Sequence, residues 1–362
     1  MRANLERNGV TRPRAGDWVE VRSGEEILAT LDEHGTLDGL PFMPEMLKFC
    51  GKRLHIAQVA HKTCDTVHYS GIRRMEAAVH LEGAHCDGAA HGGCQASCLL
   101  FWKNVWLKPI DSSAALHAES AAPGVFDVPE ALERATRQPD STARDVRYRC
   151  QITQLLAATS AWAWWNPAQY WADVRTENWK GGHVLKVLTL AAIRRLIRFN
   201  RGVRLLAAFY DALARRFGML PYALIRDQAG PIPKNAPTPG GGEALARGDW
   251  VRVRPREEIL RTLSKVGRNR GLHFDPEMVR YCGGTHRVKD IVTQILDEAT
   301  GRMVTMKNPC VMLEGVVCRS EYSGKRLMCP RAITPYWRPL WLQKVAEPPS
   351  LNNVAASEHE CR

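Results

Sequence analysis

The stretch that decides the fold is Gly16-Asp-Trp-Val-Glu-Val-Arg-Ser-Gly-Glu-Glu-Ile-Leu-Ala-Thr-Leu31, because it occurs twice. Its second copy is Gly248-Asp-Trp-Val-Arg-Val-Arg-Pro-Arg-Glu-Glu-Ile-Leu-Arg-Thr-Leu263, at an offset of 232 residues. The same offset maps Cys50 onto Cys282 and Cys86 onto Cys318, and an offset of 235 maps Trp102 and Trp106 onto Trp337 and Trp341. A long match at a fixed offset indicates two copies of one structural unit. A duplicated module therefore occupies residues 16–110 and 248–345.

Each copy predicts a small antiparallel β module with two short helices. The Asp-Trp-Val-x-Val-Arg segment alternates like a first strand, and residues 25–31 and 257–263 favour a short helix. A second short helix is expected at 44–49 and at 276–281. Further strands are expected at 287–295, 303–306 and 311–317, with a turn at 297–301. A last strand, at 105–110 and 340–345, would close the sheet.

An opening Gly-Asp-x-Val-x-Val strand followed by about four short antiparallel strands resembles an SH3-like β-barrel of the KOW type, here in tandem. The resemblance implies a fold only, because SH3-like barrels serve nucleic-acid binding, peptide binding and subunit assembly alike. The expected fold class is α+β, with two small, mainly antiparallel barrel-like modules flanking a helical middle segment.

The segments outside the modules differ from them in composition. A tail (1–15) precedes the first module, and a linker (111–146), rich in small residues at 114–124, follows it. The middle domain (147–230) predicts helices at 147–160, 167–175 and 183–217, the second starting after Asn166. A Pro- and Gly-rich linker (231–247) and a C-terminal tail (346–362) complete the expected organisation.

The chain has 11 cysteines, of which only Cys150 and Cys361 lie outside the modules. The N-terminus lacks the apolar core of a secretion signal, and charged residues interrupt the apolar stretch at 184–217, which we expect to pack on its neighbours rather than on a membrane. We therefore expect a cytoplasmic protein, in which thiols stay reduced. An odd number of thiols in that compartment favours metal ligation over a disulfide framework.

Three cysteines are present at matching positions in both copies, and a tetrahedral metal site needs a fourth ligand. The second copy supplies Cys310, which predicts the set Cys282, Cys310, Cys318 and Cys329. The best set in the first copy is Cys50, Cys86, Cys94 and Cys98, with Cys64, His85 and His91 as alternative fourth ligands. Burial as small apolar side chains would explain Cys50 and Cys282, each at the end of an apolar helix, better than Cys94 and Cys98 in a glycine-rich loop.

The identity of the metal is open between two classes. Structural zinc sites usually contain paired Cys-x-x-Cys motifs, and this sequence has none. Iron–sulfur clusters accept wider thiolate spacings, so an iron–sulfur cluster is slightly favoured over zinc, with up to one centre per module.

The net charge of +12 is distributed unevenly along the chain. Residues 16–110 carry nine basic and 12 acidic side chains, whereas residues 248–345 carry 18 basic and 10 acidic ones. The basic residues gather at the start of the second module: Arg252, Arg254, Arg256, Arg261, Arg268 and Arg270. Such a surface would suit nucleic acid or an acidic protein partner.

The sequence contains no glycine-rich nucleotide loop, His-Glu-x-x-His helix or Gly-x-Ser-x-Gly elbow. The first functional hypothesis is a metal- or cluster-binding protein that contacts a protein or nucleic acid through its basic C-terminal half. The alternative is an iron–sulfur- or zinc-dependent enzyme of a small biosynthetic pathway, with its open site in the first copy, where candidate ligands are redundant. Whether the chain is an enzyme is left undecided by these patterns.

Overall fold

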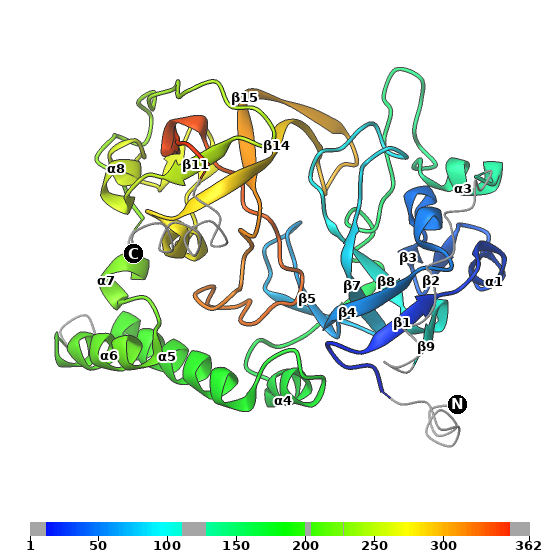
Figure 1. The fold of residues 1–362 in the computed structure, drawn as a ribbon, viewed down its shortest axis with the longest axis horizontal. Coiled ribbons are helices and arrows are strands. Elements are labelled where there is room, and N and C mark those ends of the chain that lie inside the picture. Colours follow the sequence, from blue (N-terminus) through cyan, green and yellow to red (C-terminus); the bar gives the residue numbers. More distant parts are fainter. Residues whose placement is uncertain (1–11, 111–127, 200–203, 227, 348–362) are drawn as a thin grey trace, which may run out of the picture. The chain divides into compact units, whose positions relative to one another are not determined.

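A computed structural model of the chain describes residues 12–110, 128–199, 204–226 and 228–347. The architecture is mixed α+β, with antiparallel sheets in both modules and helices in the middle of the chain (Figure 1). Two compact units are present, and unit 1 comprises Met1–Tyr222, Gln294–Thr305 and Cys318–Ile333. The second module therefore contributes two segments to unit 1. The expected small-residue linker at 114–124, most of both tails and Cys361 lie outside the described residues.

The first module is built on a five-stranded antiparallel sheet with the strand order β8-β7-β4-β1-β9 (Figure 1). The strands are β1 (Trp18–Val21), β4 (Arg53–Val59), β7 (Ala78–His85), β8 (Leu99–Lys103) and β9 (Leu107–Pro109). Alternation along β1 places Val19 and Val21 in the core, where Trp102 and Trp106 are fully buried.

The second module repeats this sheet with the order β15-β14-β11-β16. Its strands are β11 (Trp250–Val253), β14 (Thr285–Leu296), β15 (Met303–Leu313) and β16 (Leu342–Lys344). The register repeats as well, because Trp18 pairs with His55 and Trp250 pairs with Arg287. The pair Val79 and Trp102 likewise has its counterpart in a bridge between Val311 and Trp337. Both sequence offsets, 232 and 235, thus hold for strand partners.

The short helices of the two modules also correspond. A capping box at Ser23 starts α1 (Gly24–Leu28), whose counterpart is α8 (Arg256–Arg261). The second predicted helices have the expected bounds but are 3-10 helices, η1 (Pro44–Phe49) and η3 (Pro276–Tyr281). Small hairpins and turns complete the modules: β2 (Thr36–Leu37), β3 (Leu40–Pro41), η2 (Asn104–Trp106), β12 (Arg268–Asn269), β13 (Leu272–His273) and η4 (Pro339–Trp341).

The middle of the chain is helical as expected except in its first part. The helices are α3 (Glu130–Ala135), α4 (Pro167–Arg175), α5 (Gly181–Phe199), α6 (Arg204–Phe217) and α7 (Tyr222–Arg226). None of the helices in the described part of the chain combines the length and apolar character that a membrane span requires.

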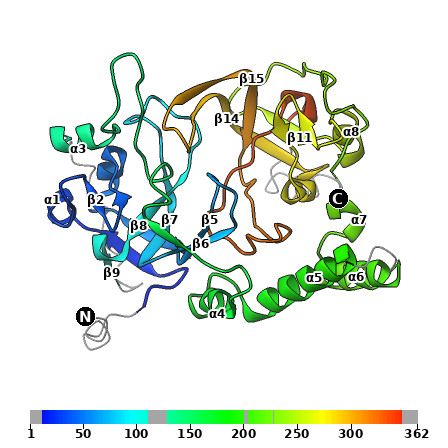
Figure 2. The ribbon, with the colours of Figure 1, turned by 180° about the vertical axis from the view of Figure 1, so that it is seen from behind.

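The predicted helix at 147–160 is wrong. Residues 151–157 form turns, and β10 (Thr159–Ala161) adds to a second sheet with β6 (Ile72–Met75) and β5 (Lys62–Cys64), visible in Figure 2. The physical reason is long-range hydrogen bonding by the buried Gln151 side chain. Its Nε2 donates to the carbonyl oxygens of Pro41 and Phe101, and its Oε1 accepts from the Phe101 N–H. These bonds tie Gln151 to the first module, and the backbone around it forms local turns, for example through the Leu155 N–H and the Ile152 carbonyl oxygen.

A buried histidine makes the stability of the first module dependent on pH. His80 on β7 is fully buried, and its Nδ1 lies 2.9 Å from the carbonyl oxygen of Leu100. Burial lowers the pKa of His80 to about 4, whereas the unfolded chain binds the proton near pH 6.5. The unfolded state therefore binds more protons between these values. Stability that is present above pH 6.5 should be lost as the pH falls towards 4.

The second module offers the matched substitution, because Met312 stands at the position equivalent to His80. We expect His80→Met to cost about 1 kcal/mol at pH 7.5, through the lost hydrogen bond to Leu100. The free energy of unfolding of the wild type should fall between pH 7 and pH 4, and the substitution should make this fall smaller by roughly 3 kcal/mol. Urea unfolding at a series of pH values measures both effects. Parallel pH profiles for the two proteins would contradict this role for His80.

Candidate metal centre

Four thiols meet at one cavity in unit 1. Cys86, Cys94, Cys98 and Cys150 line it, together with His91. The cavity volume is about 30 Å³, which corresponds to about two water molecules. Three of the thiols and the histidine come from one loop of the first module, residues 86–98, and Cys150 comes from the turns that replace the predicted helix.

The glycine-rich sequence of this loop folds its two ends together. Gly88, Gly92 and Gly93 each have a φ of 73°, a left-handed conformation that is cheap only for glycine. The carbonyl oxygen of Gly88 accepts from the N–H groups of both His91 and Gly93. At the ends of the loop, the Cys86 N–H donates to the carbonyl oxygen of Cys98 at 2.8 Å. The loop thereby places Cys86, Cys94 and Cys98 on the wall of one cavity.

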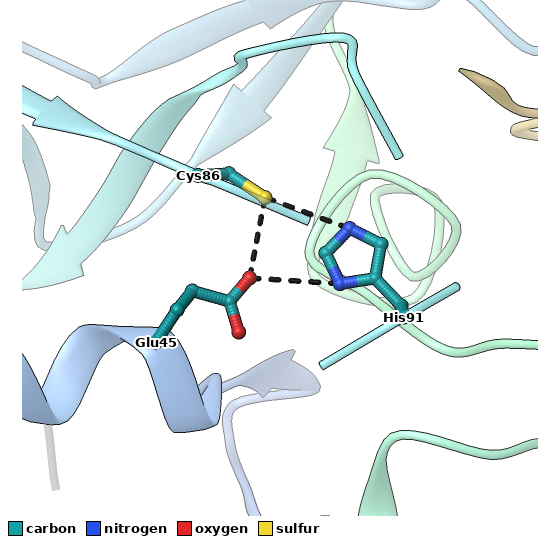
Figure 3. A group of neighbouring side chains, drawn as sticks. All are labelled: Glu45, Cys86 and His91. Atoms are coloured by element: carbon teal, nitrogen blue, oxygen red, sulfur yellow. Dashed lines mark hydrogen bonds and ion pairs between the residues drawn. The ribbon is translucent and has the colours of Figure 1, made fainter. Parts of the chain in front are cut away.

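Glu45, Cys86 and His91 form the tightest group of potential ligands (Figure 3). Cys86 Sγ lies 3.2 Å from Glu45 Oε1 and 3.5 Å from His91 Nε2, and His91 Nδ1 lies 3.5 Å from Glu45 Oε1. Glu45 is carried by η1, whose first residue, Pro44, is suited to a helix N-terminus. The side chains of Glu45 and His91 are each only 2% exposed. A buried acid, a half-buried thiol and a buried imidazole in mutual contact are a donor set suited to a cation.

The electrostatics of this group are unbalanced without an added positive charge. Glu45 Oε2 and His91 Nδ1 are buried without a hydrogen-bond partner in the described part of the protein. Burial, reinforced by Glu45, raises the pKa of Cys86 above its usual range. Burial also raises the pKa of Cys98 to about 11 and that of Cys150 to about 12, and it lowers the pKa of His91. A bound divalent cation would reverse the effect on the thiols, because it stabilises thiolates and takes neutral imidazole as a ligand.

The structure brings some of the candidate residues of the first copy together and separates others from them. Cys86, His91, Cys94 and Cys98 share the cavity. Cys50 caps the C-terminal end of η1, is not among the residues that line the cavity, and has a pKa raised to about 11 by burial. His85 Nδ1 lies 3.0 Å from the carbonyl oxygen of Ser97 and so holds the loop. Cys64 is the last residue of β5 and contacts Cys329.

Two residues of the site were missed by sequence reasoning. Cys150 lies outside the repeat, so comparison of the copies gives no signal for it. Glu45 did give a signal, because the Pro44-Glu45-Met46 segment returns as Pro276-Glu277-Met278 and an acid retained within an apolar helix is unusual. Both Glu45 and Glu277 are buried.

The four cysteines predicted for the second copy have different surroundings. Cys282 and Cys310 belong to unit 2, whereas Cys318 and Cys329 belong to unit 1. Cys310 Sγ accepts from the Arg338 guanidinium at 3.3 Å, and burial raises the pKa of Cys282 to about 12. Cys318 Sγ lies 3.3 Å from Ser320 Oγ. A second metal centre made of these four thiols stays a prediction.

The predicted basic surface also stays a prediction. Arg252, Arg261, Arg268 and Arg270 are exposed, and Arg270 donates to the Asn308 side chain. Arg254 donates to the carbonyl oxygen of Leu340 and pairs with Glu258, and Arg256 is largely covered. The guanidinium groups of these arginines therefore differ in how accessible they are to a ligand.

No known protein family, curated protein or solved structure matches this chain. A functional assignment must therefore come from the geometry of the chain itself. The cavity of unit 1 is the part that combines metal-ligand chemistry, burial and polar atoms without partners.

Proposed function

We propose that the protein binds one zinc ion in the cavity of the first module, with Cys86, His91, Cys94 and Cys98 as ligands. The observation that carries this proposal is the cavity that all four residues line, next to Glu45, Cys86 and His91, whose potential ligand atoms lie within 4.8 Å of one another. Three thiolates and one imidazole form a common tetrahedral donor set of structural zinc sites.

Glu45 would act on the histidine from outside the ligand set. Its Oε1 faces His91 Nδ1 at 3.5 Å, while His91 Nε2 faces Cys86 Sγ. A carboxylate that accepts the Nδ1 proton fixes the tautomer that offers Nε2 to the metal, and it raises the basicity of the ring. Figure 3 shows the three side chains in a triangle, in which the carboxylate contacts both the imidazole and the thiol.

Two features favour a single zinc ion over an iron–sulfur cluster. A cavity of about 30 Å³ suits one ion, because it has the volume of only about two waters. An imidazole within the closest group of donors also suits zinc better than a cluster held by four thiolates. Cys150 is the residue that would complete a four-thiolate alternative.

Four protein ligands would leave no open position on the metal, which suits a structural role. The site would hold together the 86–98 loop, η1 and the 294–305 segment, because Cys94 Sγ also accepts from the Leu296 N–H at 3.2 Å. The repeated strand order and register support the SH3-like tandem as the finer description of the fold. We infer that the zinc stabilises a binding module rather than a reaction centre.

Metal analysis with a visible spectrum, on protein purified without oxygen, tests the proposal. The expected result is a colourless protein with about one zinc per chain. Cys86→Ser and His91→Ala should lose the zinc, while Cys150→Ser, a change in the same cavity, should keep it. If the wild type instead contains iron and sulfide, and Cys150→Ser loses them, the bound group is an iron–sulfur cluster and not zinc. The absence of any bound metal would overturn the proposal.

A further inference from the structure

Two cysteines outside the metal cavity meet in unit 1, although 265 residues separate them in sequence. Cys64 ends β5, and Cys329 lies in the 318–333 segment that the second module contributes to unit 1. The Cys64 N–H donates to Cys329 Sγ at 3.1 Å, and the two thiols hydrogen-bond each other. A disulfide requires two cysteine side chains in close contact, and these two belong to one packed cluster.

A fixed cation, Arg331, lies two residues from Cys329 in the sequence. The Arg331 guanidinium, whose side chain is 3% exposed, is held by Glu298 and by the Thr66 hydroxyl. The hydrogen bond from Cys329 and, after it, the positive charge of Arg331 lower the pKa of Cys64, whereas burial raises the pKa of Cys329. The arrangement thus favours one thiolate next to one thiol, which is the starting state for disulfide formation.

Access to the pair is restricted. Cys64 and Cys329 are each 4% exposed and pack with Ile72, with Trp162 and Ile333 against them. A bulky disulfide such as oxidised glutathione would have to displace this packing, whereas a small peroxide would not. Burial therefore selects the oxidant by size.

We propose that Cys64 and Cys329 form a peroxide-sensitive thiol pair that closes reversibly into a disulfide. The Cys64 thiolate attacks hydrogen peroxide, so that an S–O bond forms, the O–O bond breaks, and the departing hydroxide takes up a proton to become water. The Cys329 thiol then attacks the sulfur of the Cys64 sulfenic acid. An S–S bond forms, the S–O bond breaks, and the Cys329 proton leaves with a second water. Two thiols are oxidised while one peroxide is reduced to two waters.

The disulfide would fasten the 318–333 segment to the first module. In the described structure this segment contains no helix or strand, and its contacts include the hydrogen bond from Lys62 to the carbonyl oxygen of Leu327 and the ion pair of Arg331 with Glu298. A covalent link at Cys329 would add a constraint that closes a long loop of the chain. Transient, redox-sensing disulfides of this kind are compatible with a reducing compartment.

The test uses the full chain with its native metal content, treated with one to five equivalents of hydrogen peroxide. Mass spectrometry after alkylation of free thiols should find a peptide linked through Cys64 and Cys329, and dithiothreitol should reverse it. Cys329→Ser should leave a sulfenic acid on Cys64, which dimedone traps. Cys64→Ser should slow the loss of thiols at least about tenfold, because the thiolate is the nucleophile.

Cys361→Ser is the matched control, since Cys361 lies outside both modules and belongs to neither predicted metal set. It should leave the formation of the linked peptide unchanged. Three results would each overturn the proposal. They are oxidation of Cys282 or the cavity thiols before the pair, a stable sulfenic acid in the wild type, and no reaction with peroxide. Zinc content measured before and after oxidation separates this result from the metal assignment, because the pair can close without release of zinc.

Discussion

Asp173→Ala should destabilise unit 1 by about 3–5 kcal/mol, since it leaves a buried charge without its counter-charge. Asp173 on α4 and Lys62 on β5 form an ion pair of 2.6 Å in which both side chains are 0% exposed. Lys62 also donates to the carbonyl oxygen of Leu327 and lies 5.0 Å from the centre of the Tyr170 ring. Burial lowers the pKa of Lys62, and Asp173 is the largest influence that opposes this shift.

The loss should be measured by hydrogen exchange of peptides from unit 1, which reports on that unit separately from unit 2. Raising the pH should recover part of the loss. A lysine whose folded pKa is depressed binds fewer protons in the native state than in the unfolded state, so the native state gains stability as the pH rises towards 10.5.

Two controls test whether the loss of stability depends on the burial of the ion pair. Asp145→Ala removes a carboxylate that pairs with Arg302 at the same distance, 2.6 Å, but at the surface, and we expect little change. The double variant Lys62→Met with Asp173→Leu should be more stable than Asp173→Ala, because no unpaired charge remains. Equal effects of Asp145→Ala and Asp173→Ala would contradict the dependence on burial.

The repeat explains why so much of the fold could be predicted from sequence. Local patterns that occur twice, such as Pro44–Phe49 and Pro276–Tyr281, define short elements whose bounds agree with the structure. Strand register follows from the same offsets, because a slip by one residue would turn every buried side chain outwards. The failure at 147–160 has the opposite cause, since Gln151 takes its hydrogen-bond partners from residues 50 and 110 positions away.

Some residues of the candidate site could likewise be predicted from the sequence, and others could not. The cysteines of the 86–98 loop could be found because they are close in sequence and flanked by glycines. Cys150 and the contact between Cys64 and Cys329 depend on tertiary packing, which no local pattern encodes. Cys50 shows the limit of reasoning from the repeat: its match with Cys282 also fits a shared place at the ends of η1 and η3. Retention in both copies reports a common structural position, and chemistry has to be argued separately.

Gly88→Ala should abolish stable zinc binding, whereas Gly83→Ala should preserve it. Both glycines have left-handed backbones, with φ values of 73° and 69°. Alanine therefore costs about 1–2 kcal/mol of strain at either position. A methyl group at Gly88 would overlap the backbone of Cys94, lying 2.6 Å from its nitrogen, while one at Gly83 would meet nothing within 4 Å. The backbone strain is the same in both variants, so any difference in their zinc binding reports the displacement of Cys94.

We expect Gly88→Ala to lower zinc affinity by at least about 10–100-fold, the range seen when the support of a metal ligand is lost. Because zinc binding supplies folding free energy, chelation should lower the melting temperature of the variant by less than it lowers that of the wild type. Gly83→Ala should retain about one zinc per chain and the full shift on chelation. Zinc analysis and thermal unfolding with and without chelator measure both effects. Full zinc retention in Gly88→Ala would show that Cys94 is dispensable and would move the fourth ligand to Cys150.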